Sequence, residues 1–144
     1  MLFGKRKRIV KRILIVEDEP LTAFDNEMML ADLGYDVVAT LDSFDDAIAL
    51  LDREDVDLVL SDVRLSGSRS GLDLARAATK RGIPVLFSTG HEIPEQAKAV
   101  AVGCLSKPYT ERQLRIAIES VDRLLAGETP KAGKGLELYP RAES

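Results

Sequence analysis

Apolar runs of strand length alternate with amphipathic stretches along most of the chain. Residues 13–16 (ILIV) are aliphatic throughout and mostly β-branched, which is typical of a strand buried on both faces. Runs of the same kind predict four further strands, at residues 35–40, 57–61, 84–88 and 104–106. Helical spacing and capping residues predict the helices, at residues 21–33, 43–51, 71–80, 94–100 and 110–126.

The order of these segments predicts the fold class. A strand followed by a helix, five times over, is the pattern of an α/β fold: a doubly wound five-stranded parallel sheet with helices on both faces. We expect this single domain to cover residues 12–126. Residues 1–11 would form a basic N-terminal extension, and residues 127–144, which have little apolar content, a flexible C-terminal tail.

The composition agrees with one globular domain. The 144 residues, 45% of them hydrophobic, suit a single core, and no apolar run approaches the length of a membrane span. The single cysteine, Cys104, excludes an internal disulfide and a cysteine-based metal site. We therefore expect the protein to reside in a reducing cytoplasm.

Charge is distributed unevenly. Residues 1–12 carry six bases and no acid, whereas the rest of the chain has 14 bases against 24 acids. Because contacts to phosphate need clustered Lys and Arg, this acidic body argues against a nucleic-acid partner. We interpret the basic segment as a solvated terminus, with weak attraction to an anionic partner as the alternative.

Polar residues that can carry chemistry follow the predicted strands. Glu17 and Asp18 come after the first strand, Asp62 after the third, Thr89 after the fourth and Lys107 after the fifth. Ligands of such sheets bind outside the carboxyl ends of the strands. We therefore expect three carboxylates, one hydroxyl and one ammonium group to meet at one rim of the sheet.

This set of groups suits phosphoryl transfer. Clustered carboxylates need a compensating cation, and Mg²⁺ takes oxygen ligands from one or two carboxylates together with waters and phosphate oxygens. Asp62 can act as a nucleophile toward phosphorus and give an aspartyl phosphate. The metal would neutralise the transferred group. Lys107 can pair with one phosphoryl oxygen, and Thr89 can donate to another.

Four segments, ILIVEDEP, LVLSDVRL, PVLFSTG and SKPY, resemble the receiver domain of two-component response regulators, with a CheY-like, flavodoxin-like fold, over residues 12–125. The resemblance implies that Asp18 is the direct Mg²⁺ ligand and that Glu17 acts largely through water. It makes Asp62 the phosphoacceptor, a further metal ligand, and it assigns the backbone carbonyl of Arg64 to the metal site.

The resemblance also assigns the other end of the rim. Thr89 is similar to the switch hydroxyl of the family and Lys107 to its invariant lysine, with a cis peptide expected between Lys107 and Pro108. Cys104 stands where many receivers have an aromatic switch residue, and as a buried thiol it is most simply a small apolar side chain. Residues 89–107 are about one helical turn shorter than usual, which predicts a shortened fourth helix.

Residues 87–90 (FSTG) are similar to the FAT GUY subgroup of receivers, although Ser88 and His91 replace the Ala and Tyr of its full motif. That subgroup comprises mostly stand-alone receivers of alphaproteobacteria, many of which feed general stress-response phosphorelays. His91 is interpreted as a solvent-facing loop residue. Ile116, opposite the apolar stripe of the last helix, is a candidate partner contact.

The leading hypothesis is a single-domain response regulator, phosphorylated on Asp62 by a sensor histidine kinase or histidine phosphotransfer protein. It would signal by conformational change or phosphoryl relay to a downstream protein, as a monomer or weak homodimer. It would not be an enzyme beyond its own phosphorylation and dephosphorylation. The alternative is a phosphorylation-independent protein-binding module with a receiver fold. A phosphatase is disfavoured because Arg64 replaces the second Asp that such enzymes need, and a Rossmann domain because no glycine-rich turn follows Val16.

Overall fold

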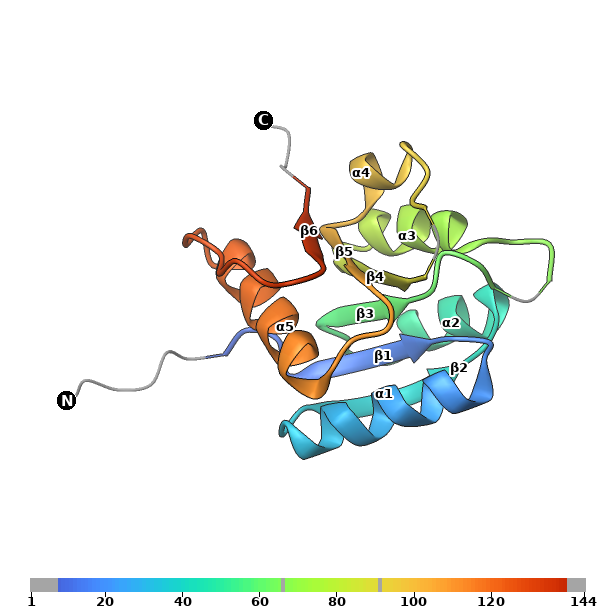
Figure 1. Cartoon of the computed structure of the whole chain (residues 1–144). Helices are drawn as coiled ribbons and strands as arrows, with labels where there is room; N and C mark the ends of the chain where they lie inside the picture. The colour runs from blue at the N-terminus through green and yellow to red at the C-terminus, as the bar shows by residue number, and fades with distance from the viewer. Residues whose placement is uncertain (1–7, 66, 91, 140–144) are drawn as a thin grey trace.

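The computed structural model describes residues 8–65, 67–90 and 92–139, and within them a single six-stranded sheet has the order β2-β1-β3-β4-β5-β6 (Figure 1). The first five strands are parallel, as predicted, and β6 is antiparallel to β5. The strands are β1 (Arg12–Val16), β2 (Asp36–Leu41), β3 (Leu58–Ser61), β4 (Val85–Thr89), β5 (Gly103–Ser106) and β6 (Leu136–Leu138).

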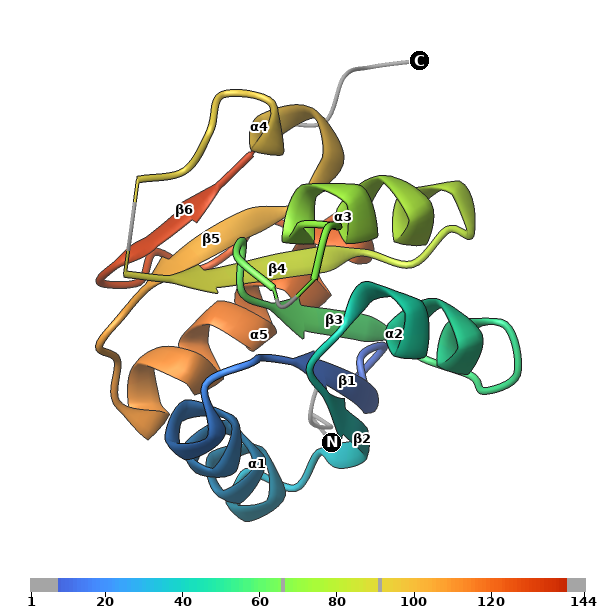
Figure 2. The same cartoon turned by 90° about the vertical axis from the view of Figure 1, so that its right-hand side faces the viewer.

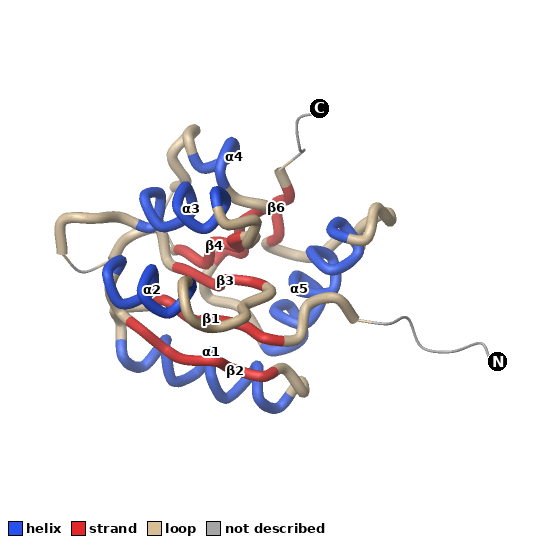
Figure 3. Tube along the Cα trace, turned by 180° about the vertical axis from the view of Figure 1, so that it is seen from behind, coloured by secondary structure: helices blue, strands red, loops and turns tan. Residues whose placement is uncertain are grey.

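Helices cover both faces of the sheet, which confirms the predicted doubly wound architecture (Figures 2 and 3). One face carries α1 (Pro20–Asp32) and α5 (Glu111–Leu125). The other carries α2 (Phe44–Leu51), α3 (Gly71–Lys80) and α4 (Ala97–Val100). The predicted shortening of the fourth helix is confirmed, since α4 has 4 residues. No helix in the described part of the chain is long and apolar enough to cross a membrane.

The central strands divide their side chains between two cores. In β1, Leu14 and Val16 pack toward α2 and α3, whereas Ile13 and Ile15 pack toward α1 and α5. All four are fully buried, which explains why the sequence of this strand is aliphatic without alternation. The strands therefore form a rigid frame, and the polar residues that follow them are held at its rim.

The C-terminal segment departs from the prediction. Residues 127–144 were expected to be flexible, but Leu136–Leu138 form β6 and raise the strand count from five to six. The physical reason is that β5 would otherwise expose an edge of unpaired backbone groups. The same segment covers Ile116, because a methyl group built on Gly133 would lie 2.9 Å from Ile116 Cγ2. Residues 140–144 lie outside the described part.

The N-terminal boundary of the domain also differs from the prediction. Residues 1–11 were expected to precede the domain, but Val10 is fully buried in the core that α1 and α5 share. The backbone N–H groups of Ile9 and Val10 both donate to the buried carboxylate of Asp122 on α5, at 2.7 Å. The guanidinium group of Arg8 lies 4.4 Å from the centre of the Tyr35 ring. The other bases of the extension, apart from Lys11, lie outside the described residues.

Replacing Asp122 with alanine should lower the free energy of unfolding by about 1.5 kcal/mol, because two backbone donors would lose a charged acceptor in a buried place. Urea unfolding measures this loss. The surface variant Asp52→Ala, which breaks the exposed pair with Arg81, is the control and should change stability much less. Equal effects of the two substitutions would show that the N-terminal segment is not anchored through Asp122.

Candidate functional site

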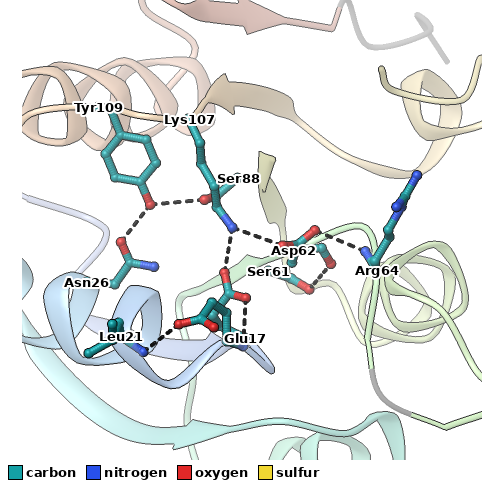
Figure 4. A network of polar contacts seen from close by, with 10 residues as sticks. Glu17, Leu21, Asn26, Ser61, Asp62, Arg64, Ser88, Lys107 and Tyr109 are labelled. Carbon is teal, nitrogen blue, oxygen red and sulfur yellow. Dashed lines mark hydrogen bonds and ion pairs between the residues drawn. The ribbon is translucent and has the colours of Figure 1, made fainter. Parts of the chain in front are cut away.

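The structure brings Glu17, Asp62 and Lys107 together at the carboxyl ends of the parallel strands (Figure 4). Val16 is in register with Ser61, so Glu17 and Asp62 leave neighbouring strands at the same level. Thr89 ends β4 in register with Ser106, the residue before Lys107. Asp18 follows Glu17 and is exposed at the same rim. The shared location that was expected from strand order is therefore observed.

Lys107 is the centre of the cluster. Its Nζ donates to Glu17 Oε1 at 2.7 Å and to Asp62 Oδ2 at 2.9 Å. The three side chains are 21%, 2% and 12% exposed respectively, so the ion pairs are largely shielded from water. Burial lowers the pKa of Lys107, but the hydrogen bonds to the two carboxylates and their charges outweigh burial and raise it. The lysine is thus held in its charged form between two carboxylates.

Asp62 is positioned by the loop that follows β3. Its Oδ1 accepts the backbone N–H of Arg64 at 3.0 Å, while Oδ2 accepts from Lys107. The hydroxyl of Ser61 donates to the backbone carbonyl of Asp62 at 2.8 Å. The backbone N–H of Gly71 donates to the carbonyl of Val63 at 2.7 Å and fixes the loop against the start of α3. The Asp62 carboxylate thus lies at the rim, and each of its two oxygens is held by a hydrogen bond. The metal role expected for the Arg64 carbonyl stays a prediction.

Glu17 and Asp18, the acidic pair after β1, lie in different environments. Glu17 is buried, and its Oε2 accepts the N–H of Glu19 at 3.1 Å. Asp18 is exposed. Glu19 in turn caps α1 by accepting the N–H of Leu21 at 2.8 Å. These contacts fix the chain direction at the rim, so that only one member of the pair faces solvent.

The donor set fits Mg²⁺ by its chemistry. Carboxylate oxygens of Asp18 and Asp62 stand at one rim, and Mg²⁺ commonly binds one or two carboxylates and keeps several waters. Among the described residues, no three His, Cys, Asp or Glu side chains form a ready-made metal cage. An ion that retains its waters does not need such a cage. Asp18 and Asp62 are the residues that would hold it, with Glu17 behind them.

Thr89 and Lys107 are joined through the backbone. Thr89 is buried at the end of β4, and its carbonyl accepts the N–H of Lys107 at 2.9 Å. The peptide between Lys107 and Pro108 is cis, as the resemblance implied. The role of the Thr89 hydroxyl toward a phosphoryl group stays a prediction. The predicted place of His91 lies outside the described residues.

A second polar network beside Lys107 was missed by sequence reasoning. The Tyr109 hydroxyl donates to Asn26 Oδ1 at 2.6 Å and lies 2.9 Å from Ser88 Oγ (Figure 4). Burial raises the pKa of Tyr109, although these hydrogen bonds and the charge of Lys107 oppose the rise. The available signal was Asn26, a polar residue at helical spacing from the buried Ala23. The network ties α1, β4 and the loop after β5 together.

Cys104 takes no part in this chemistry. The side chain is buried in the core toward α3 and α4. Burial, with smaller contributions from the charges of Glu137 and Asp62, raises the pKa of its thiol to about 11. Since the thiolate is the reactive form, this cysteine is a weak nucleophile at neutral pH. The interpretation as a small apolar core residue agrees with this environment.

The structure thus defines a doubly wound α/β domain with carboxylates and a bridging lysine at the carboxyl ends of its strands. The comparisons identify the family: the response regulator receiver domain matches residues 13–119, and the chain belongs to that family. Its members are signalling domains of two-component systems, which confirms the resemblance to CheY-like receivers.

Two relatives illustrate the place of the chain within the family. The chain is 34% identical to the transcriptional regulatory protein PdtaR of Mycobacterium tuberculosis over 140 residues, which is 90% of this chain and 68% of PdtaR. It is 34% identical over 98 residues to the phyllosphere-induced regulator PhyR of Methylorubrum extorquens, covering 62% of this chain and 37% of PhyR.

Solved structures agree with these relatives. The N-terminal domain of a response regulator/sensory box/GGDEF protein from Carboxydothermus hydrogenoformans is 32% identical, with a TM-score of 0.73, over 81% of this chain and 98% of that one. The match over almost the whole of that receiver domain confirms the fold.

Proposed function

We propose that this receiver accepts a phosphoryl group on Asp62 and signals through the change that follows. The observation that supports this most is the position of Lys107, whose Nζ bridges Glu17 and Asp62. In the unphosphorylated protein this ammonium group balances the negative charges of the two carboxylates. It is also placed to pair with an oxygen of a phosphoryl group attached to Asp62.

In the proposed reaction a carboxylate oxygen of Asp62 attacks phosphorus, and the bond from phosphorus to the donor breaks. Lys107 then exchanges its contact with Asp62 for a phosphoryl oxygen. Mg²⁺ bound by Asp18 and Asp62 would supply charge neutralisation for the transferred group. The hydroxyl of Thr89, at the end of the neighbouring strand, would donate to another phosphoryl oxygen and so carry the change into β4.

The phosphodonor would be a sensor histidine kinase or a histidine phosphotransfer protein, and α1 supplies a surface for it. Leu21, Phe24 and Met28 are 76%, 58% and 56% exposed. Their spacing places them along one side of α1, the helix that begins directly after the acidic pair. An apolar stripe of this kind favours a protein partner that docks beside the rim.

Likeness to PhyR, which one solved structure describes as a stress response regulator, supports a place in a stress-response phosphorelay, as the FSTG segment also suggests, and we place that relay in the cytoplasm. PhyR is longer than the region matched, so this assignment concerns the receiver alone.

Incubation with Mg²⁺ and a small phosphodonor should add the mass of one phosphate to the intact protein. Asp62→Asn should abolish the gain, and a chelator should suppress it in the unmodified chain. Asp45→Asn, an exposed acid at the start of α2, is the matched control and should retain the full gain. Persistence of the added mass in Asp62→Asn would overturn the assignment.

A further inference from the structure

The C-terminal segment, residues 131–139, closes the edge of the sheet at β5. The N–H of Ser106 donates to the carbonyl of Gly135 at 2.9 Å, and the N–H of Tyr139 donates to the carbonyl of Val102 at 2.9 Å. Between these bonds β6 pairs with Gly103, Cys104 and Leu105 of β5, with Cys104 opposite Glu137. The backbone of β5 is thus satisfied on this side by the chain's own strand.

Side chains of β6 alternate between the two faces of the sheet. Leu136 and Leu138 pack against the core that α5 covers, and Tyr139 is buried in the core toward α3 and α4. Upstream, the hydroxyl of Ser120 on α5 donates to the carbonyl of Lys131 at 2.8 Å. The edge therefore accepts an extended segment that has apolar residues at alternate positions.

Two positions of the segment fit this edge poorly. Glu137 faces a hollow of about 390 Å³ whose rim also carries Glu92 and Glu95. Lys98 is the one base of that lining, and it is paired with Glu95 at 3.5 Å. Glu137 itself makes no ion pair among the described residues, so its carboxylate adds to an acidic rim. The buried hydroxyl of Tyr139 has no hydrogen-bond partner among the described residues.

The absence of a side chain at Gly103 allows a neighbouring strand to pair closely with β5. A methyl group built there would lie 2.5 Å from the carbonyl oxygen of Glu137 and 3.0 Å from Leu138 Cδ2. All three of its nearest atoms belong to β6, so the missing side chain matters for the paired strand and not for the rest of the domain. The residue marks β5 as a strand that accepts a neighbour.

We propose that the β5 edge is a docking surface for an extended segment of a partner protein with an apolar–basic–apolar pattern, and that residues 131–139 are its internal occupant. Charge complementarity selects the partner, because a basic residue opposite Cys104 would meet Glu92 and Glu95 where Glu137 now adds a third negative charge. Main-chain hydrogen bonds would supply affinity, and the alternating side chains specificity.

The test uses the full chain and two labelled peptides. One peptide has the sequence of residues 133–139, and the other carries the change Glu137→Lys. The protein is used unmodified and as the double variant Leu136→Asp/Leu138→Asp, which removes the apolar anchors of β6 and leaves β1 to β5 unaltered. Fluorescence anisotropy measures binding at low and high salt.

The lysine peptide should bind the double variant several-fold more tightly than the glutamate peptide, with the preference shrinking as salt rises. Both peptides should bind the unmodified protein at least about tenfold more weakly, because β6 occupies the edge. Gly103→Ala added to the double variant should abolish binding. Absence of binding to the double variant, or equal affinity for the two peptides, would overturn the proposal.

The rate of Cys104 alkylation provides an independent readout of the opened edge. Cys104 is 5% exposed in the unmodified protein and pairs with Glu137 of β6. Release of β6 in the double variant should accelerate alkylation at least about tenfold. A circular dichroism spectrum should show that the remaining fold is retained. An unchanged alkylation rate in a folded double variant would show that residues 131–139 do not cover this edge.

Discussion

The Gly71→Ala variant is expected to lose about 3 kcal/mol of unfolding free energy and most of its capacity for phosphorylation at Asp62. A methyl group at this first residue of α3 would overlap the backbone carbonyl of Asp62 and lie 2.8 Å from Val63 Cα. These are backbone atoms of the loop that positions the phosphoacceptor. They cannot yield without moving Asp62, so stability and phosphorylation should fall together.

Gly90→Ala is the matched control for this substitution. Gly90 also borders the site, but a methyl group there would lie 3.9 Å from Lys107 Cβ, an ordinary contact. Its effect on the free energy of unfolding should stay within about 1 kcal/mol. Urea unfolding and intact-mass measurement of both variants make the comparison. If Gly71→Ala were as stable and as readily phosphorylated as Gly90→Ala, the close packing of α3 on the Asp62 loop would be wrong.

The Lys107→Met variant should lose about 2 kcal/mol of unfolding free energy at neutral pH. This loss is smaller than the loss expected when one partner of a fully buried ion pair is removed, because the lysine is partly exposed. Glu17 and Asp62 would face each other without a cation. Added Mg²⁺ should restore more stability to this variant than to the unmodified protein, because the ion would supply the missing positive charge. Lys98→Met, on the surface, is the control and should respond to neither change.

The contribution of Lys107 to stability should also depend on pH, and it should be lost at alkaline pH. The pKa of Lys107 is raised above its usual value of 10.5, so the folded protein holds this proton more tightly than the unfolded chain does. Its contribution is complete below that value and is lost as pH rises through the higher pKa of the folded state. The unmodified protein should therefore lose stability above about pH 10.5, and Lys107→Met should lack this part of the loss. Equal alkaline losses would contradict the bridging role of Lys107.

Much of this site was predictable because strand order alone places its residues. Glu17, Asp62 and Lys107 each follow an apolar run, and parallel strands bring their carboxyl ends to one rim. The resemblance to receivers also predicted the short α4, from the reduced length of residues 89–107. Predictions of this kind succeed where a signal of a few residues determines the outcome.

The features that were missed depend on contacts between residues far apart in the chain. Asp122 accepts from Ile9 and Val10 across more than 110 positions, and nothing near either segment indicates this pairing. Similarly, β6 is three residues long in a polar segment, and only the open edge of β5 gives it a partner. The terminal boundaries were therefore wrong, while the central strands were predicted correctly; the roles of the residues at the rim stay predictions.

The hydrogen bonds of Tyr109 were only partly predictable from the sequence. Its position after Pro108 was visible as part of a motif, but its partners on α1 and β4 follow from packing alone. Because the network fixes the loop that carries Lys107, it belongs to the support of the site and not to its chemistry. Sequence reasoning finds charged groups at strand ends more readily than the buried polar groups that hold them.

The most direct test of the central claim is to identify the residue that carries the phosphoryl group. The protein is phosphorylated with Mg²⁺ and a small phosphodonor, then reduced with borohydride, which converts an aspartyl phosphate to homoserine, and its peptides are sequenced by mass spectrometry. The structure predicts homoserine at position 62 and unmodified aspartate at position 18. Homoserine at another acid, or at no position despite a gain in mass, would contradict the assignment of Asp62 as the phosphoacceptor.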